Sequence, residues 1–496
     1  MSNELLDIFI IGGGVNGTGI ARDAAGRGLS VMLVEKDDLA SGTSSASTKL
    51  IHGGLRYLEN YDFMLVRHAL IEREVLLRSA PHIIWPLRFI LPHHKELRSA
   101  FILRAGLLIY DNLGGRKELP ATKTRNLRTH KTGKPLDPKL RKGFEYSDCW
   151  VNDARLVVLN ALDAHERGAV IKTRTEFVSA KRAQGVWEIV YKDELGEQVV
   201  RARAMINAAG PWLSLTDDEI KDSKPATIPV RLIKGSHIIV NQVYEGKHAY
   251  IFQHPDGRIV FTIPYEGKFT LIGTTEAELE GRIEDAKISE KEIEYLCDLA
   301  SKYFVTKISP DDVVHTYSGV RGLKDEDEDA SEVSRDYELN LDNVDDQAPL
   351  LSVVGGKITT FRRLAEDAME ILCPILGNEM SNWTEDAFLP GGDLGGMTIK
   401  KFLKTKHKRY PWFSKEEMLR LCQAYGSRID EVLRKAKSKQ ELGRDFGAGF
   451  SEAELQYLIK TEWATQAEDV LWRRSKLLLH LDASQQQAVA DYLEKY

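Results

Sequence analysis

The chain has 496 residues, of which 43% are hydrophobic and 29% charged, so it is long enough for about three domains with ordinary globular cores. Its formal net charge of −6 argues against a protein whose whole surface binds nucleic acid, so any basic function has to be local. The four cysteines lie far apart without a C-x-x-C pair, which predicts neither a disulfide framework nor a thiolate metal site and favours a reducing compartment.

Neither a secretory signal nor a membrane span is predicted. An apolar, strand-like segment at 5–11 follows the first residues directly, with no basic segment or cleavage site before it. No uninterrupted apolar stretch approaches the roughly 18 to 20 residues that cross a bilayer. We therefore expect a cytoplasmic protein whose membrane contact, if it has any, is peripheral.

Residues 5–35 predict a strand, a glycine turn, a helix over 18–27 and a second strand, LSVMLVEK. Gly12, Gly14 and Gly17 form G-x-G-x-x-G in this turn, which lets the backbone approach a pyrophosphate at the helix N-terminus. Glu35 ends the second strand, where its carboxylate can accept hydrogen bonds from ribose hydroxyls. Together these features predict a dinucleotide site.

Farther along the chain, residues 80–145 have a different texture that we interpret as an insertion. Short β-branched runs between 170 and 345, such as WEIVYKD and SHIIVNQV, predict a largely antiparallel sheet that carries the substrate. A strand at 350–356 and a helix over 359–376 return to the α/β pattern of the start. The remaining residues predict helices, as in EEMLRLCQAYG.

We therefore expect an α/β protein, α+β overall, with a discontinuous Rossmann-like dinucleotide domain. This domain comprises residues 1–80, 145–215 and 346–388. The substrate domain comprises 81–144 and 216–345, and a C-terminal helical cap comprises 389–496.

Three features favour FAD over NAD. After Glu35 the chain enters DLASGTSSASTKLIHGGLRYL, a small, hydroxyl-rich segment suited to a phosphate and an isoalloxazine ring. MINAAGPW at 205–212 is a strand that ends in a small-residue turn, as close approach to adenosine requires. Gly355 and Gly356 are expected to open a helix whose amides stabilise negative charge on a reduced flavin.

The whole chain resembles the aerobic, FAD-dependent glycerol-3-phosphate dehydrogenases, which have the D-amino-acid-oxidase-like flavoprotein fold. The resemblance rests on SSASTKLIHGGLRYLE, FEYSDCWVNDARL, RLIKGSHIIV, TYSGVRGL and LLSVVGGKITTFRRLAE, in that order. Gly322 departs from it, because we expect a proline after the arginine. The resemblance implies a homodimer and electrons passed to a membrane quinone. We expect noncovalent FAD, because no histidine linkage site stands out in the sequence.

The resemblance also implies which residues line the pocket. Arg56, Arg321 and Lys357 are expected to neutralise a phosphate dianion, with Arg335 as a weaker fourth cation. His237 is the candidate for accepting the hydroxyl proton, with a satisfied core histidine as the alternative, and Tyr57 positions substrate or transfers a proton. The expected cofactor-binding residues are Gly12, Gly13, Gly14, Asn16, Gly17, Glu35, Thr43, Ser44, Ser45, Lys49, His52, Gly53, Gly54, Ala209, Gly210, Gly355, Gly356, Lys357 and Thr359. No metal is required.

A basic tract at 115–143 carries ten Lys and Arg against two acids, a local charge of +8. Trp85, Phe89 and the stretch AFILRAGLLIY precede it, and we expect these side chains to be exposed. Such a surface suits anionic lipid on the inner face of the cell membrane, with a solvated basic loop over a core helix as the alternative. Nucleic acid is not expected, because the tract lacks interleaved stacking aromatics.

The sequence thus predicts oxidation of sn-glycerol 3-phosphate to dihydroxyacetone phosphate by hydride transfer to flavin. Three alternatives stay open. They are an oxidase that uses oxygen directly, an amine or amino-acid oxidase of the same fold, and a flavoprotein without catalytic activity.

Overall fold

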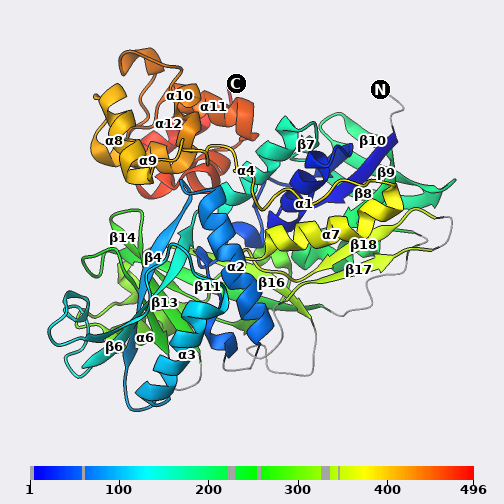
Figure 1. The fold of residues 1–496 in the computed structure, drawn as a ribbon. Helices are drawn as coiled ribbons and strands as arrows, with labels where there is room; N and C mark the ends of the chain where they lie inside the picture. Colours follow the sequence, from blue (N-terminus) through cyan, green and yellow to red (C-terminus); the bar gives the residue numbers. More distant parts are fainter. Residues whose placement is uncertain are drawn as a thin grey trace.

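The computed structural model describes residues 5–58, 62–221, 223, 230–253, 258–324, 336–344 and 347–496. Figure 1 shows three parts: a sheet with helices near the N-terminus, a second sheet below and beside it, and a group of helices formed by the C-terminal residues. Each part has a hydrophobic core of its own.

The first sheet has the strand order β17-β18-β10-β1-β2-β7, and β1, β2, β7, β10 and β18 run parallel. These strands are β1 (Leu5–Ile11), β2 (Val31–Val34), β7 (Val170–Lys172), β10 (Gly196–Asn207), β17 (Glu338–Asp342) and β18 (Leu350–Val354). A hairpin of β8 (Glu176–Ala183) and β9 (Val186–Asp193) extends it by pairing with β10.

Both faces of this sheet are covered, which is why β1 is nearly continuously apolar. Ile8 and Ile10 pack on one side, in the core formed with helices α1 (Val15–Gly26), α4 (Asp153–Glu166) and α7 (Phe361–Leu376). Phe9 and Ile11 point to the other side, where they pack with residues of the β8–β9 hairpin.

The second sheet has the order β15-β11-β14-β13-β12-β4-β6-β3, with β16 paired to β11 and β5 to β6. Its strands are β3 (Leu50–Ile51), β4 (Ile84–His93), β5 (Lys123–Asn126), β6 (Lys142–Val151), β11 (Val230–Asn241), β12 (Ala249–Gln253), β13 (Ile259–Tyr265), β14 (Phe269–Gly273), β15 (Ala277–Glu278) and β16 (Val313–Lys324). All pairs are antiparallel except β4 with β12.

Helices cover this sheet on two sides. Helix α6 (Glu290–Tyr303), which starts with a capping box between Ser289 and Glu292, packs with β11 and β12 residues in one core. Helices α2 (Phe63–Ser79) and α3 (Ala100–Leu113) contribute to the other core. A short helix, α5 (Leu213–Asp217), follows β10.

The C-terminal helices form a separate core. They are α8 (Ile399–Arg409), α9 (Lys415–Tyr425), α10 (Ile429–Val432), α11 (Glu452–Glu462) and α12 (Ala483–Leu493), with a π-helix at Asp469–Arg474 between α11 and α12. Figure 1 shows these helices, in orange and red, against the end of the molecule where α4 lies.

The structure corrects several expectations. The run WPLRFILP forms the strand β4, which lies between β12 and β6 in the second sheet, and Phe89 is buried rather than exposed. The run WEIVYKD is β9, which belongs to the first sheet rather than to the antiparallel substrate sheet. Strand β9 joins the first sheet because it pairs with its two neighbours along the chain, β8 and β10.

Sheet membership also crosses three of the predicted domain ranges. Strands β3 and most of β6 fall within ranges expected for the dinucleotide domain but lie in the second sheet. Strand β17 falls within the range expected for the substrate domain but pairs with β18 of the first sheet. The division into three units otherwise stays a prediction.

Candidate functional site

The glycine turn between β1 and α1 has the close backbone approach that the sequence predicts. Gly12 has a φ of +109°, and a Cβ there would lie 2.5 Å from the carbonyl oxygen of Ala208. A Cβ on Gly17 would overlap the carbonyl oxygen of Gly12. Helix α1 begins at Val15, three residues before the predicted start, so the amides of its first turn lie at this turn.

Glu35, at the end of β2, is tied to the same turn. Its carboxylate accepts hydrogen bonds from the backbone amides of Gly13 (2.7 Å) and Asp37 (2.9 Å). Burial raises the pKa of Glu35, and the two backbone hydrogen bonds oppose this rise. The side chain therefore braces the glycine turn in addition to the ribose role that the sequence predicts.

The hydroxyl-rich segment after β2 packs on the start of α1 and on β16. The side chain of Ser44 accepts a hydrogen bond from the amide of Val15 (2.9 Å), which satisfies one of the free amides of α1. The hydroxyl of Thr43 donates to the carbonyl oxygen of Val320 in β16. This segment thus joins the glycine turn to the second sheet.

The side chain of Lys49, a residue expected at the cofactor, is buried in an ion pair. It is fully buried, and its ammonium group lies 2.9 Å from a carboxylate oxygen of Asp153 at the start of α4. It also donates to the carbonyl oxygen of Ser45 (3.0 Å). The side chain therefore holds the backbone of the hydroxyl-rich segment against α4.

The loop after β18 meets the glycine turn and the segment that contains His52. The side-chain amide of Asn16 donates from Nδ2 to the carbonyl oxygen of Gly355 (3.2 Å), and the backbone amide of His52 donates to the hydroxyl of Thr359 (3.3 Å). Gly355 and Gly356 have φ angles of +70° and +99°. They do not open α7, which begins later, at Phe361.

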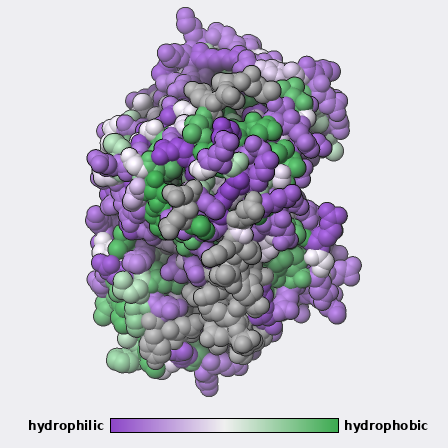
Figure 2. Space-filling model, turned by 90° about the vertical axis from the view of Figure 1, so that its right-hand side faces the viewer, coloured by the Kyte–Doolittle hydropathy of each residue, from purple (hydrophilic) through white to green (hydrophobic). Residues whose placement is uncertain are grey.

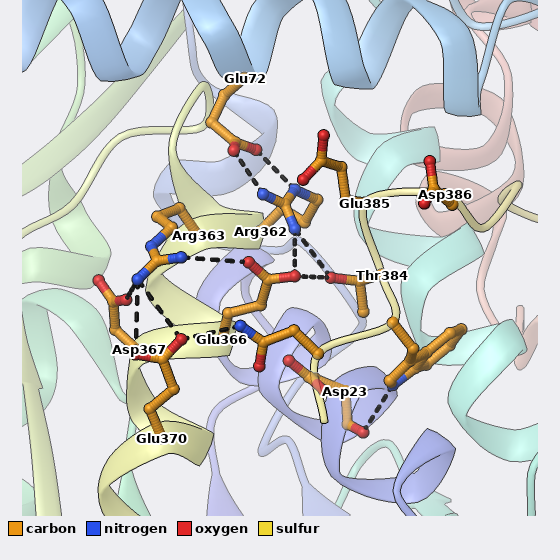
Figure 3. A network of polar contacts seen from close by, with 12 residues as sticks. Asp23, Glu72, Arg362, Arg363, Glu366, Asp367, Glu370, Thr384, Glu385 and Asp386 are labelled. Carbon is orange, nitrogen blue, oxygen red and sulfur yellow. Dashed lines mark hydrogen bonds and ion pairs between the residues drawn. The ribbon is translucent and has the colours of Figure 1, made fainter. Parts of the chain in front are cut away.

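A network of buried charges anchors α7 to α2 (Figure 3). The guanidinium of Arg362 donates to Glu72 at 2.5 and 2.7 Å and to the hydroxyl of Thr384 at 3.0 Å. It also pairs with Glu366 in the next turn of α7. The network fixes α7, and with it the loop that carries Lys357.

A second buried network holds Gly53. Its backbone amide donates to the hydroxyl of Tyr110 in α3 (2.8 Å), and this hydroxyl donates to Asp148 of β6 (2.8 Å). Arg73 of α2 pairs with the same carboxylate at 2.8 Å. Burial raises the pKa of Asp148 to about 6, and Arg73 opposes the rise.

His237 lies in the middle of β11 and is buried. Its Nε2 atom lies 3.0 Å from the hydroxyl oxygen of Thr48, and its ring stacks on Tyr317 of β16 with centroids 4.7 Å apart. Burial lowers the pKa of His237 well below its ordinary value, and the charges of Lys49 and Arg321 lower it further. The imidazole is therefore neutral at physiological pH.

Lys357 and Arg321 are the two expected phosphate-binding cations whose side chains the structure describes. Each contacts another side chain. The ammonium of Lys357 lies 3.9 Å from the centroid of the Tyr57 ring. The guanidinium of Arg321 lies 3.7 Å from Glu276. The carbonyl oxygen of Gly322 lies 4.0 Å from the position that a Cβ on Gly355 would take, so the segments that carry Arg321 and Lys357 adjoin.

Two expected residues lie outside the described part. Arg335 falls in the range 325–335, and the side chain of Arg56 is outside the description although its backbone belongs to a 3₁₀ helix at Leu55–Leu58. Within the described residues, no group of three or more His, Cys, Asp or Glu side chains is arranged to hold a metal ion.

The chain is similar to known proteins over almost its whole length. Residues 7–349 match the family described as FAD dependent oxidoreductase, and residues 382–495 match the C-terminal domain of alpha-glycerophosphate oxidase. The glycerol-3-phosphate dehydrogenase of Pseudomonas aeruginosa is 50% identical over 99% of this chain and 95% of its own length. The chain belongs to this family of FAD-dependent oxidoreductases.

Two further proteins are similar to this chain over nearly its whole length. The D-erythritol 1-phosphate dehydrogenase of Brucella abortus is also 50% identical, over 99% of this chain and 98% of its own length. The crystal structure of the Bacillus halodurans glycerol-3-phosphate dehydrogenase, complexed with FAD, superposes with a TM-score of 0.78. It has 28% sequence identity and covers 100% of this chain and 95% of that one.

The FAD-dependent family requires a dinucleotide cradle, and the residues present here fit one. Gly12, Gly14 and Gly17 have no side chain at positions where neighbouring atoms come close. The side-chain oxygen of Asn16 is buried beside them without a hydrogen-bond partner among the described residues. Ala209 and Gly210 add a second small-residue turn after β10, where Gly210 has a φ of +58°. FAD is the cofactor of this oxidoreductase.

Sequence reasoning missed several residues that hold this site in place. Thr48 and Tyr317 fix the ring of His237, Tyr110 binds Gly53, and Glu276 pairs with Arg321. Tyr317 lies in the quoted run TYSGVRGL, and Thr48 lies in the quoted run SSASTKLIHGGLRYLE. Tyr110 and Glu276 give no local signal, because each partner lies far away in the sequence.

Proposed function

We propose that this protein oxidises sn-glycerol 3-phosphate to dihydroxyacetone phosphate. One observation carries the proposal. The segments of Arg321 and Lys357 adjoin each other next to the glycine turn, where Asn16 binds the carbonyl oxygen of Gly355. Two cations beside the dinucleotide turn suit a phosphate dianion, and Arg56 and Arg335 are proposed to complete the set.

The cations have different parts in binding. Lys357 acts as a compact charge held over Tyr57, which limits the positions of its ammonium group. Arg321 offers a planar fork for two phosphate oxygens, and its pairing with Glu276 sets the direction of the fork. Tyr57 is proposed to orient the substrate hydroxyl groups.

His237 is proposed to accept the proton of the substrate alcohol. Its pKa lies well below the ordinary value, so the ring is neutral and able to accept a proton at pH 7. Lys49 and Arg321 disfavour the protonated ring, so His237 returns readily to its neutral form after turnover. Thr48 holds Nε2, which fixes the orientation of the ring.

When bound without a covalent link, FAD supplies the hydride acceptor for the substrate carbon and a route for electrons to a membrane quinone. The residues of the chain bind the pyrophosphate at the glycine turn, orient the substrate and take up the alcohol proton. Oxygen consumption without added quinone separates the oxidase alternative from the dehydrogenase.

A second candidate substrate is D-erythritol 1-phosphate. The Brucella abortus protein that bears this substrate in its name is as similar to this chain as the Pseudomonas aeruginosa glycerol-3-phosphate dehydrogenase. The same phosphate cations serve both esters, so the distinction depends on space beyond the reacting carbon. Comparing kcat/KM for the two esters decides between them.

Anaerobic titration of the flavin tests the catalytic proposal. We expect saturating glycerol 3-phosphate to bleach the oxidised flavin absorbance, whereas glycine and D-alanine leave it unchanged. Bleaching by an amino acid and not by the phosphate ester supports the amino-acid oxidase alternative. A flavin that stays oxidised with every substrate contradicts the proposal and supports a flavoprotein without catalysis.

His237→Gln tests the proton acceptor. We expect a lower kcat with an unchanged spectrum of the bound flavin, because glutamine keeps a polar group at this position but does not take up a proton. Thr48→Val is a matched variant that keeps the imidazole and removes its hydroxyl partner. An unchanged turnover and pH profile in His237→Gln removes this residue from the mechanism.

We also propose that the protein binds the inner face of an anionic membrane through α3 and the basic tract. The side chain of Phe101 is 83% exposed, and Ile102, Leu108 and Ile109 on the same helix are exposed as well. Of the ten cations at 115–143, only Arg125 is not exposed. Figure 2 shows an apolar area at the lower left, the level at which Figure 1 draws α3.

No helix in the described ranges has the length and apolar character needed to span a bilayer, so the proposed contact lies at the lipid surface. Flotation with anionic vesicles at low salt tests it. We expect Phe101→Ser combined with Ile109→Ser to abolish flotation, whereas Leu195→Ser, at a 79% exposed site between β9 and β10, does not. Equal flotation of both variants contradicts the lipid contact. The proposed homodimer is tested by light scattering of the purified protein.

A further inference from the structure

The C-terminal domain holds the loop that follows β2. Asp38 is fully buried in this loop, and its two carboxylate oxygens accept bidentate hydrogen bonds from Arg474 at 2.6 and 2.7 Å. Arg473 donates to the same carboxylate at 2.6 Å. Both arginines belong to the π-helix at Asp469–Arg474, so two guanidinium groups from one short segment hold a single acid.

The loop of Asp38 contacts the dinucleotide turn. The amide of Ala40 donates to the carbonyl oxygen of Gly13 (3.1 Å), two residues from the gripped acid. A second tie runs through Arg174, whose backbone amide donates to the carbonyl oxygen of Asp37 (2.8 Å) and whose side chain pairs with Asp469 (2.8 Å). The position of the loop therefore depends on the π-helix.

The same segment reaches the second sheet with its aromatic side chain. Trp472 contacts the ring of His315 with centroids 4.5 Å apart and that of Tyr317 at 6.0 Å. Tyr317 stacks on His237 and donates from its hydroxyl to the carbonyl oxygen of Ser47 (2.9 Å). Trp472 is thus one aromatic ring away from the histidine.

We propose that residues 469–476, which we call the C-terminal strut, position both halves of the active site. Arg473 and Arg474 hold the dinucleotide loop through Asp38, and Trp472 holds the ring of His237 through Tyr317. These are positioning residues, because none of them touches the reacting atoms. The second half of the proposal rests on the proposed proton transfer by His237, whereas the first half depends only on FAD binding.

Asp38→Asn and Arg473→Lys test the first half. Asparagine keeps the shape of the side chain but removes the charge that two buried guanidinium groups share, so the loop and the glycine turn are expected to shift. We expect the Kd of FAD, measured by recovery of flavin fluorescence, to rise about tenfold or more in Asp38→Asn. Arg473→Lys keeps the charge and is expected to give a smaller rise in the Kd of FAD. If Asp38→Asn does not fold, the Kd of Arg473→Lys tests the first half of the proposal.

Glu454→Gln is the matched control. Glu454 is buried in the same domain and is held by Arg420 (2.6 Å) and Tyr425 (2.8 Å), neither of which belongs to the strut. The Glu454→Gln substitution is expected to lower the thermal stability of the domain without changing the Kd of FAD. An equal rise of the Kd in Glu454→Gln and Arg473→Lys overturns the first half, because general destabilisation then explains both.

Trp472→Leu and Trp472→Phe test the second half. We expect Trp472→Leu to lower kcat and to shift its pH profile while the KM and the Kd of FAD stay close to the wild-type values. Trp472→Phe, which keeps a ring against Tyr317, is expected to restore much of the profile. An unchanged pH profile in Trp472→Leu overturns this half. A wild-type enzyme that fails to oxidise the ester contradicts the proposed function instead, and the FAD measurements still stand.

Discussion

Removing the hydroxyl of Tyr110 removes one of the links between Gly53 and the buried Asp148. Tyr110 is 1% exposed, and its hydroxyl both accepts from the amide of Gly53 and donates to the carboxylate. In Tyr110→Phe the amide of Gly53 loses its hydroxyl partner, and the carboxylate keeps Arg73 and the backbone of Gly53. Two hydrogen bonds are lost for one atom removed.

The expected cost follows from these two losses. A neutral hydrogen bond contributes about 0.5–1.5 kcal/mol, and a hydrogen bond to a charged acceptor contributes about 1.5–3 kcal/mol. The losses share one atom and are not fully additive, so we expect Tyr110→Phe to lower the free energy of unfolding by about 2–4 kcal/mol. Because Gly53 precedes the loop that carries Tyr57, the KM for substrate is expected to rise.

Thermal release of flavin fluorescence measures this effect, and Tyr265→Phe is its matched control. Tyr265 is buried in the same core, but its hydroxyl has no hydrogen-bond partner among the described residues. We expect Tyr265→Phe to be neutral or slightly stabilising, since removing an unsatisfied buried hydroxyl removes a penalty. Equal Tm values for the two variants refute the reasoning.

Three further predictions follow from the fold. Gly17→Ala is expected to abolish FAD binding, measured by flavin absorbance after gel filtration, because a Cβ there overlaps the carbonyl oxygen of Gly12; a variant that retains flavin contradicts this. Arg362→Met leaves two buried carboxylates without their shared cation and is expected to cost about 3–5 kcal/mol in urea unfolding. The half-exposed Arg363→Met costs at most about 1 kcal/mol, and equal costs contradict the difference. Burial and then the charge of Lys49 lower the pKa of Lys476 from 10.5 to about 7. The unfolded state therefore binds more protons between these values, and wild-type stability gains about 1 kcal/mol per pH unit from this lysine as pH rises from 8 to 9.5. Lys476→Met is expected to lose this gain, and parallel Tm curves for the two proteins contradict it.

Much of the dinucleotide site follows from local sequence. A strand, G-x-G-x-x-G and a helix can be read within thirty residues of one another, because the alternating and helical periods and the glycine spacing are local properties. The turn at Gly12 and the brace from Glu35 follow this pattern. The run of family motifs also places FAD, which the comparisons confirm.

Other assignments needed the tertiary structure. Lys49 lies in a motif expected to touch the cofactor, and the structure pairs its ammonium group with Asp153, 104 residues away. Phe89 was expected at a lipid surface, but β4 pairs on both edges and buries it. Neither outcome is visible in a window of sequence, because the partner of a buried charge and the neighbours of a strand are set by contacts across the chain.

By itself, the sequence determined where the strand, turn and helix of the dinucleotide site lie, because each depends on residues close together in the chain. Only the tertiary structure decided that Asp38 is held by Arg473 and Arg474, 435 and 436 residues later. An isolated acid after a strand predicts nothing about its partner. A buried carboxylate is stable only where the fold brings cations to it, and that meeting is a property of the folded chain.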